Sequence, residues 1–181
     1  LAIRNKAFLY WKNFWSDIYI KASSIESFKV DDFFRQKYIS VIIDDDNVIA
    51  MHLYTTFNLQ CEASLNHSYF NFYDKLFIQS LKSQSISSVF SMEFMTVNPK
   101  FRKSVLKKKS HYSQILPHLG AKIFENTAAD AIIAPARTDV GVSKLAYQMG
   151  FSCIQANVKQ RGFNCDMVAL FKDNYISPED P

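Results

Sequence analysis

The residues best placed for chemistry lie within one predicted strand and in the basic stretch that follows it. Glu93 stands within residues 88–97, where apolar residues alternate imperfectly with Ser91, Glu93 and Thr96, which predicts a strand. A carboxylate there could take the proton of an attacking amine, directly or through water, because a protonated amine has no lone pair for attack. A solvent-exposed strand carboxylate without a catalytic role is the alternative.

A cluster of positive charge follows this strand. Asn98-Pro99 ends the strand because proline cannot donate to a sheet ladder. Six basic side chains then precede a predicted helix over residues 113–126: Lys100, Arg102, Lys103, Lys107, Lys108 and Lys109. A loop leading into a helix N-terminus offers N–H groups and the positive end of the helix dipole to a phosphate. The stretch therefore predicts binding of an anion or an acidic partner, with a solvated loop as the alternative.

The other reactive side chains form no convincing motif. His111 and His118 are seven residues apart without an evident third ligand, and three adjacent aspartates at 44–46 are typical of a turn, so we predict no metal. Three cysteines give neither a disulfide framework nor the close pairs of a zinc site: Cys61, Cys153 and Cys165. Cys153 and Cys165 fall in predicted strands, where we expect buried, unreactive thiols.

Composition bounds the class of protein. A length of 181 residues with 48% hydrophobic and 21% charged residues predicts one globular domain over residues 1–181. With only four glycines, neither a G-x-G-x-x-G nor a G-x-x-x-x-G-K-[ST] loop can be written, which excludes Rossmann dehydrogenases and P-loop NTPases. The 16 Phe and 9 Tyr predict a large core, with a cleft for an apolar ligand as the alternative.

Charge and hydropathy bound the partners and the location. A net charge of +4 argues against a nucleic-acid-binding protein, and an RNA-binding face built on the basic stretch and nearby aromatic residues is a minor alternative. No apolar run approaches the ~20 residues that span a bilayer, and the first residues lack the apolar region of a secretory signal. We therefore expect no transmembrane segment, and a cytoplasmic protein.

The elements that must position these residues follow from apolar periodicity. Helices are predicted over 2–15, 68–81, 113–126 and 139–148, and strands over 38–43, 48–54, 88–97, 131–134, 151–156 and 166–172. Pro117 is expected in the first turn of its helix, Asp139 as the cap of the last helix and Gly150 as its end. The pattern indicates an α/β (α+β) protein with a mixed central sheet and helices on both faces.

The order of these elements resembles the GNAT superfamily of N-acyltransferases. Two stretches carry the likeness: Val97-Asn98-Pro99 with the basic loop containing Arg102, and residues 139–151, which end in the Gly-Phe pair that precedes the next strand. The resemblance covers roughly residues 31–172. It implies a GNAT-like mixed sheet and direct transfer of an acyl group from a pantetheine thioester, either acyl-CoA or acyl carrier protein, to a small amine acceptor.

The resemblance also assigns site residues. It implies that the pantetheine arm pairs with the strand backbone at Phe94, Met95, Thr96 and Val97, and that the phosphates meet Arg102, Lys103, Ser104, Val105, Lys107 and Lys108. The loop lacks the family's usual glycines, which makes it more similar to acyl-homoserine-lactone synthases and long-chain N-acyl amino acid synthases, whose donor is acyl carrier protein. The position of the family's tyrosine acid holds Ala146, with Tyr147 one residue later. A GNAT-like binding module that has lost catalysis is therefore the alternative function.

Overall fold

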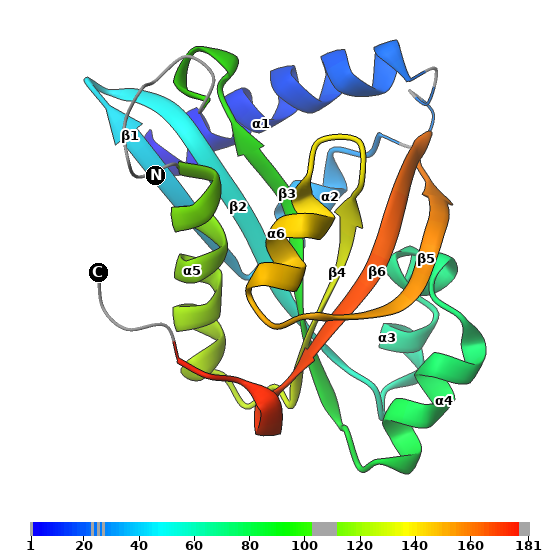
Figure 1. The fold of residues 1–181 in the computed structure, drawn as a ribbon. Coiled ribbons are helices and arrows are strands. Elements are labelled where there is room, and N and C mark those ends of the chain that lie inside the picture. The colour runs from blue at the N-terminus through cyan, green and yellow to red at the C-terminus, as the bar shows by residue number, and fades with distance from the viewer. Residues whose placement is uncertain (1, 23, 25, 27, 103–111, 178–181) are drawn as a thin grey trace. The chain divides into compact units, whose positions relative to one another are not determined.

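The computed structural model describes residues 2–22, 24, 26, 28–102 and 112–177 (Figure 1). The helices are α1 (Ala2–Lys21), α2 (Asp31–Phe34), α3 (Glu62–Leu65), α4 (Lys75–Ser83), α5 (Tyr112–Glu125) and α6 (Val142–Gln148). The strands are β1 (Tyr38–Asp44), β2 (Asn47–Asn58), β3 (Ser88–Val97), β4 (Ala131–Arg137), β5 (Ser152–Gln160) and β6 (Phe163–Phe171). Short 3-10 helices occupy Ser68–Phe72, Pro99–Phe101 and Lys172–Asn174.

The six strands form one mixed sheet in the order β1-β2-β3-β4-β6-β5. β1 and β2 are an antiparallel hairpin whose turn places Asp45 and Asp46 at positive φ. β3 and β4 are parallel, and among the described residues their ladder joins only Val89–Ser91 to Ala131–Ile133. β3 nevertheless continues to Val97. The predicted mixed α/β sheet is confirmed, and its central parallel pair is short.

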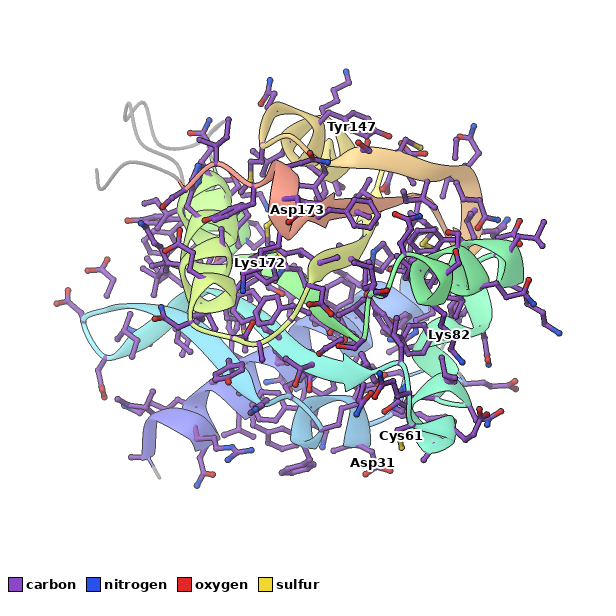
Figure 2. All side chains as sticks on the ribbon, turned by 90° about the horizontal axis from the view of Figure 1, so that it is seen from below. Asp31, Cys61, Lys82, Tyr147, Lys172 and Asp173 are labelled. Atoms are coloured by element: carbon purple, nitrogen blue, oxygen red, sulfur yellow. The ribbon has the colours of Figure 1, made fainter. Side chains whose placement is uncertain are left out.

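The chain divides into two compact units. The first comprises the described residues of 1–55 and 92–123. In this unit Figures 1 and 2 show α1 and α5 on opposite faces of the sheet. Helix α1 buries one stripe at i, i+4 spacing: Ala7, Trp11, Trp15 and Tyr19. Many of the aromatic residues thus fill a core.

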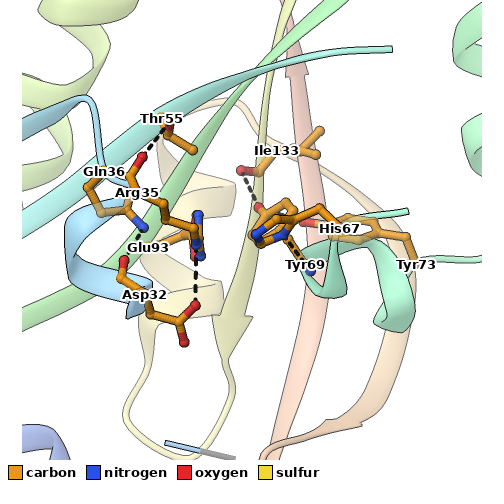
Figure 3. A network of polar contacts seen from close by, with 9 residues as sticks. All are labelled: Asp32, Arg35, Gln36, Thr55, His67, Tyr69, Tyr73, Glu93 and Ile133. Atoms are coloured by element: carbon orange, nitrogen blue, oxygen red, sulfur yellow. Dashed lines mark hydrogen bonds and ion pairs between the residues drawn. The ribbon is translucent and has the colours of Figure 1, made fainter. Parts of the chain in front are cut away.

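The second unit comprises the described residues of 56–91 and 124–181. Its core is an aromatic and aliphatic cluster that includes Phe57, Tyr69, Tyr73, Val89, Ile133 and Met167. The Tyr69 hydroxyl donates to the carbonyl of Ile133, 3.2 Å away, and lies 3.0 Å from the Tyr73 hydroxyl (Figure 3). Because Ile133 is the last β4 residue in the β3–β4 ladder, this hydroxyl satisfies a buried backbone acceptor where the ladder ends.

Two predicted helices are wrong in detail. The segment 68–81 is not one helix, because Asp74 caps α4 by accepting the N–H of Leu76 at 2.8 Å and the chain before it forms a 3-10 helix. Pro117 lies inside α5 rather than in its first turn. Proline has no N–H, so the helix lacks the hydrogen bond from residue 117 to the carbonyl of Ser113. The carbonyl of Leu116 accepts a hydrogen bond from the Tyr54 hydroxyl at 3.0 Å.

The last helix and the final strands also differ from prediction. Asp139 does not cap α6, because its carboxylate accepts from Arg137 Nε at 3.0 Å and Gly141, at φ +77°, takes the cap position instead. Gly150 ends the helix at φ +88°, as predicted. Strand β5 continues to Gln160, and β6 begins at Phe163. None of the described helices combines the length and the apolar character needed to cross a membrane.

Candidate active site

Strand β3 changes the face of its side chains at Phe94. In a regular strand, residues i and i+2 share a face. Met92 contacts the α5 side, where its Cε lies 2.9 Å from a Cβ built on Gly120, whereas the ring of Phe94 packs on Trp11 and Trp15 of α1. Phe94 has φ +56°, which a bulky side chain rarely adopts. The strand is therefore locally interrupted, as in a β-bulge, a feature found near active sites.

Aromatic packing holds this interruption in place. The Phe94 ring meets Trp11 and Trp15 edge to face, at centroid distances of 5.4 Å and 5.2 Å. The indole N–H of Trp15 donates to the Thr96 hydroxyl at 3.0 Å, and that hydroxyl donates to the carbonyl of Phe94 at 2.8 Å. A left-handed residue costs on the order of 1–3 kcal/mol, so these contacts must offset it.

Glu93 lies buried beside the interruption and is paired with Arg35. Its residue exposure is 7%, which excludes the exposed strand carboxylate. Arg35 donates through Nη1 to Oε1 at 2.8 Å and through Nη2 to Oε2, while its Nε donates to Asp32 Oδ1 at 3.2 Å (Figure 3). Burial acts to lower the pKa of Arg35, but attraction and hydrogen bonds from Glu93 and then Asp32 outweigh it and raise that pKa. Arg35 therefore stays charged.

The predicted donor-binding residues divide between described and undescribed parts of the chain. Thr96 is buried, and Phe94, Met95 and Val97 are half-buried on β3, beyond the end of its ladder with β4. Arg102 is exposed just after the 3-10 turn, and its Nε donates to the carbonyl of Val97 at 3.2 Å. The remaining predicted residues lie outside the described part of the chain: Lys103, Ser104, Val105, Lys107 and Lys108.

Tyr147 is engaged elsewhere in the second unit. Its hydroxyl donates to Asp166 Oδ2 at 2.6 Å, and Oδ1 of the same carboxylate accepts the N–H of Asn157 at 3.1 Å. The hydrogen bond to Asp166, followed by burial, raises the pKa of Tyr147. A phenol held in this way is a poor proton donor for a departing thiolate. Neither Tyr147 nor Ala146 is therefore suited to the acid role.

Within the described part of the chain, the cysteines and histidines form no cluster of metal ligands. Cys61, labelled in Figure 2, is exposed; Cys153 is also exposed, against the prediction of a buried thiol, whereas Cys165 is buried and burial raises its pKa to about 11. Within the described ranges, no three His, Cys, Asp or Glu side chains gather as metal ligands. His111 lies outside the described residues, and the His118 ring nitrogen Nδ1 lies 2.6 Å from the carbonyl of Gln114.

One buried histidine has no predicted role. His52 on β2 is 4% exposed, and its Nδ1 lacks a hydrogen-bond partner among the described residues. Burial lowers the pKa of His52 to about 3, so the ring is neutral at physiological pH.

Comparisons with known proteins agree on the fold alone. No family model matches the chain, and no curated protein matches its sequence. A mosquito arylalkylamine N-acetyltransferase-like protein matches in structure with a TM-score of 0.52 at 14% identity, over 80% of this chain and 82% of the other. FeeM, an N-acyl amino acid synthase from uncultured soil microbes, matches at 0.52 and 11% identity, over 76% of each chain. The chain has the GNAT fold.

A plant GNAT structure shares this fold with its donor bound. Arabidopsis thaliana NAA60, in complex with acetyl-CoA, matches with a TM-score of 0.52 at 11% identity, over 81% of this chain and 85% of the other. A shared fold does not fix the reaction. In this GNAT fold, Glu93 and Phe94 occupy the strand to which the sequence resemblance assigned the donor.

The sequence predicted Glu93 as a candidate base but did not indicate its partners. Asp32 and Arg35 sit one turn apart at α2, and Arg35 lies 58 residues from Glu93 in the chain. Their i, i+3 spacing was the available signal, because oppositely charged residues at such spacing on a helix tend to pair. Nothing in the sequence connects this pair to β3.

Proposed function

We propose that this chain is an N-acyltransferase that moves an acyl group from a pantetheine thioester to an amine. The observation that carries the proposal is the interrupted strand β3, where the left-handed Phe94 follows the buried carboxylate of Glu93 and the basic loop comes directly after the strand. Strain of this kind is concentrated at functional sites. The GNAT fold supports the same interpretation.

The donor would lie along β3 and the loop that follows it. Its pantetheine amides would pair with the backbone at residues 94–97, beyond the end of the β3–β4 ladder, and its phosphates would meet Arg102 and residues 103–108. Both acyl-CoA and acyl carrier protein carry this arm. The basic stretch would attract an acidic carrier protein over a wide surface, which favours that donor.

Glu93 is the residue we assign to proton removal. The lone pair of the amine nitrogen attacks the thioester carbonyl carbon, the C–S bond breaks, and the amine proton passes to Glu93 directly or through one water. The thiolate leaves and takes its proton from water, because the described residues give no candidate acid. Backbone N–H groups of β3 would polarise the carbonyl oxygen during attack.

A binding module that has lost catalysis is the second candidate. Two observations favour it: both oxygens of Glu93 accept hydrogen bonds from Arg35, and the hydroxyl of Tyr147 is held by Asp166. A carboxylate that accepts hydrogen bonds from a guanidinium can still act as a base, so the pairing with Arg35 does not by itself exclude catalysis. Turnover therefore decides between the two candidates.

The test combines donor binding with transfer. Thermal unfolding is measured with acetyl-CoA, dodecanoyl-CoA and an acylated carrier protein, and single-turnover transfer is measured to agmatine, phenethylamine and phenylalanine. A donor at 100 times its Kd stabilises the native state by about 2.7 kcal/mol, which raises Tm by several degrees. Stabilisation with transfer supports the acyltransferase. Stabilisation without transfer supports the binding module, and no stabilisation by any donor contradicts both.

A further inference from the structure

A single guanidinium holds two carboxylates next to the interrupted strand. The Nη atoms of Arg35 both donate to Glu93, and its Nε donates to Asp32. The side chains of all three residues are largely buried, at 17% exposure for Arg35, 6% for Glu93 and 8% for Asp32. A planar guanidinium that donates in this forked way fixes the plane of the carboxylate it binds, which a lysine ammonium cannot do.

Contacts around the short helix α2 restrain Arg35. The Gln36 side chain donates to the carbonyl of Asp32 at 2.9 Å, and the Thr55 hydroxyl donates to the carbonyl of Arg35 at 3.3 Å (Figure 3). Phe33 is fully buried and packs on Phe8 and Trp11 of α1. The residue that orients Glu93 is thus anchored through its backbone, its Nε and the adjacent side chains.

We propose that Arg35 is a positioning residue for acyl transfer, which fixes the plane of the Glu93 carboxylate relative to the amine proton. Asp32 keeps the guanidinium in the orientation that this requires. Arg35 exchanges no proton and acts only through Glu93. The inference rests on the proposed function, because it assigns Arg35 to the same proton transfer.

The interruption of β3 explains why the carboxylate of Glu93 must be held in place. Phe94 faces α1, and α2 packs on α1 through Phe33, so Arg35 draws Glu93 to the face that Phe94 also occupies. Two consecutive side chains share one face because of the interruption. A released Glu93 could rotate about its side-chain bonds, and a displacement of about 1 Å can reduce a rate by about 100-fold.

The experiment compares four variants with the wild type, using dodecanoyl-CoA and acetyl-CoA as donors and the three amines above as acceptors. Arg35→Lys keeps the positive charge but removes the two parallel N–H donors to Glu93. We expect kcat to fall at least about tenfold, with the donor KM within about twofold of the wild type. Arg137→Gln is the matched control. Arg137 has 18% side-chain exposure and pairs with Asp139, outside the proposed site, so its kcat should stay within about twofold of the wild type.

The other two variants test whether Arg35 acts only through Glu93. Glu93→Gln should abolish most turnover, and adding Arg35→Gln to it should lower kcat no further, since residues that act as one unit are not additive. Arg35→Gln also removes the hydrogen-bond donor of Asp32 Oδ1, so the double variant must be shown to fold before its kcat is compared. Circular dichroism and Tm check each fold.

The outcomes separate the inference from the proposed function. If the wild type turns over, Glu93→Gln is inactive and Arg35→Lys is fully active, then Arg35 has no positioning role. The proposed acyltransferase function still stands in that case. A further loss of kcat on adding Arg35→Gln to Glu93→Gln also overturns the positioning role, because Arg35 would then act independently. Full activity of Glu93→Gln removes the proposed base and this inference together, and so does a wild type without turnover.

Discussion

Replacing Phe94 by alanine and by glycine separates the cost of the backbone from the loss of the ring. Both variants remove the ring from Trp11 and Trp15, so that loss cancels in the comparison. At φ +56°, an alanine Cβ costs about 1–2 kcal/mol that glycine does not, while glycine loses about 0.5–1 kcal/mol more conformational entropy on folding. The glycine variant should therefore be more stable than the alanine variant by about 0.5–1 kcal/mol.

The neighbouring position supplies the control. Met95 has an ordinary negative φ, so Met95→Gly should be less stable than Met95→Ala by about 0.5–1 kcal/mol, the reverse order. Urea unfolding followed by circular dichroism gives all four free energies of unfolding. If Phe94→Gly is less stable than Phe94→Ala, β3 is a regular strand at this point and the argument for a strained site is refuted.

Three further predictions concern the structure around the site. Gly120→Ala should destabilise by about 1–2 kcal/mol, because the added Cβ lies 2.5 Å from the buried ring of Tyr54 and this overpacking exceeds the gain in helix propensity; urea midpoints measure it, and an increase in stability would contradict it. Tyr69→Phe should cost about 1–3 kcal/mol and more than Tyr73→Phe, because the Tyr69 hydroxyl donates to the buried carbonyl of Ile133, whereas the Tyr73 hydroxyl meets the Tyr69 hydroxyl; equal losses would count against this. His52 has its pKa lowered from 6.5 to about 3, so stability is full above pH 6.5 and is lost as pH falls towards 3, with about 2 kcal/mol gone by pH 5. His52→Gln should remove this loss, as urea unfolding at pH 7 and pH 5 would show.

Local sequence signals predicted several elements correctly. Strand β3 has the predicted bounds, because Asn98-Pro99 ends it, and the hairpin turn lies at the aspartates that favour a turn. The cap of α6 was wrong because Arg137, two residues away, competes for Asp139. Local propensity does not reveal which of two polar partners a carboxylate will choose.

The site was only partly predictable for a related reason. Glu93 stood out as a carboxylate inside an apolar strand, but the sequence offered no way to connect it with Arg35. The left-handed conformation of Phe94 was also hidden, because glycine is the usual marker of positive φ and this strand has none. Tertiary contacts from segments remote in sequence hold both features: Arg35 at the end of α2 pairs with Glu93, and α1 packs on Phe94.

The packing of α1 on Phe94 gives the protein an intrinsic optical probe. The chain has two tryptophans, and both indole rings contact Phe94. Both belong to the first unit, and the second unit has none. Tryptophan emission therefore reports on the packing of α1 in the first unit, including its contact with the interrupted strand, and it would register a change there that the spectrum of the remaining aromatic residues could not isolate.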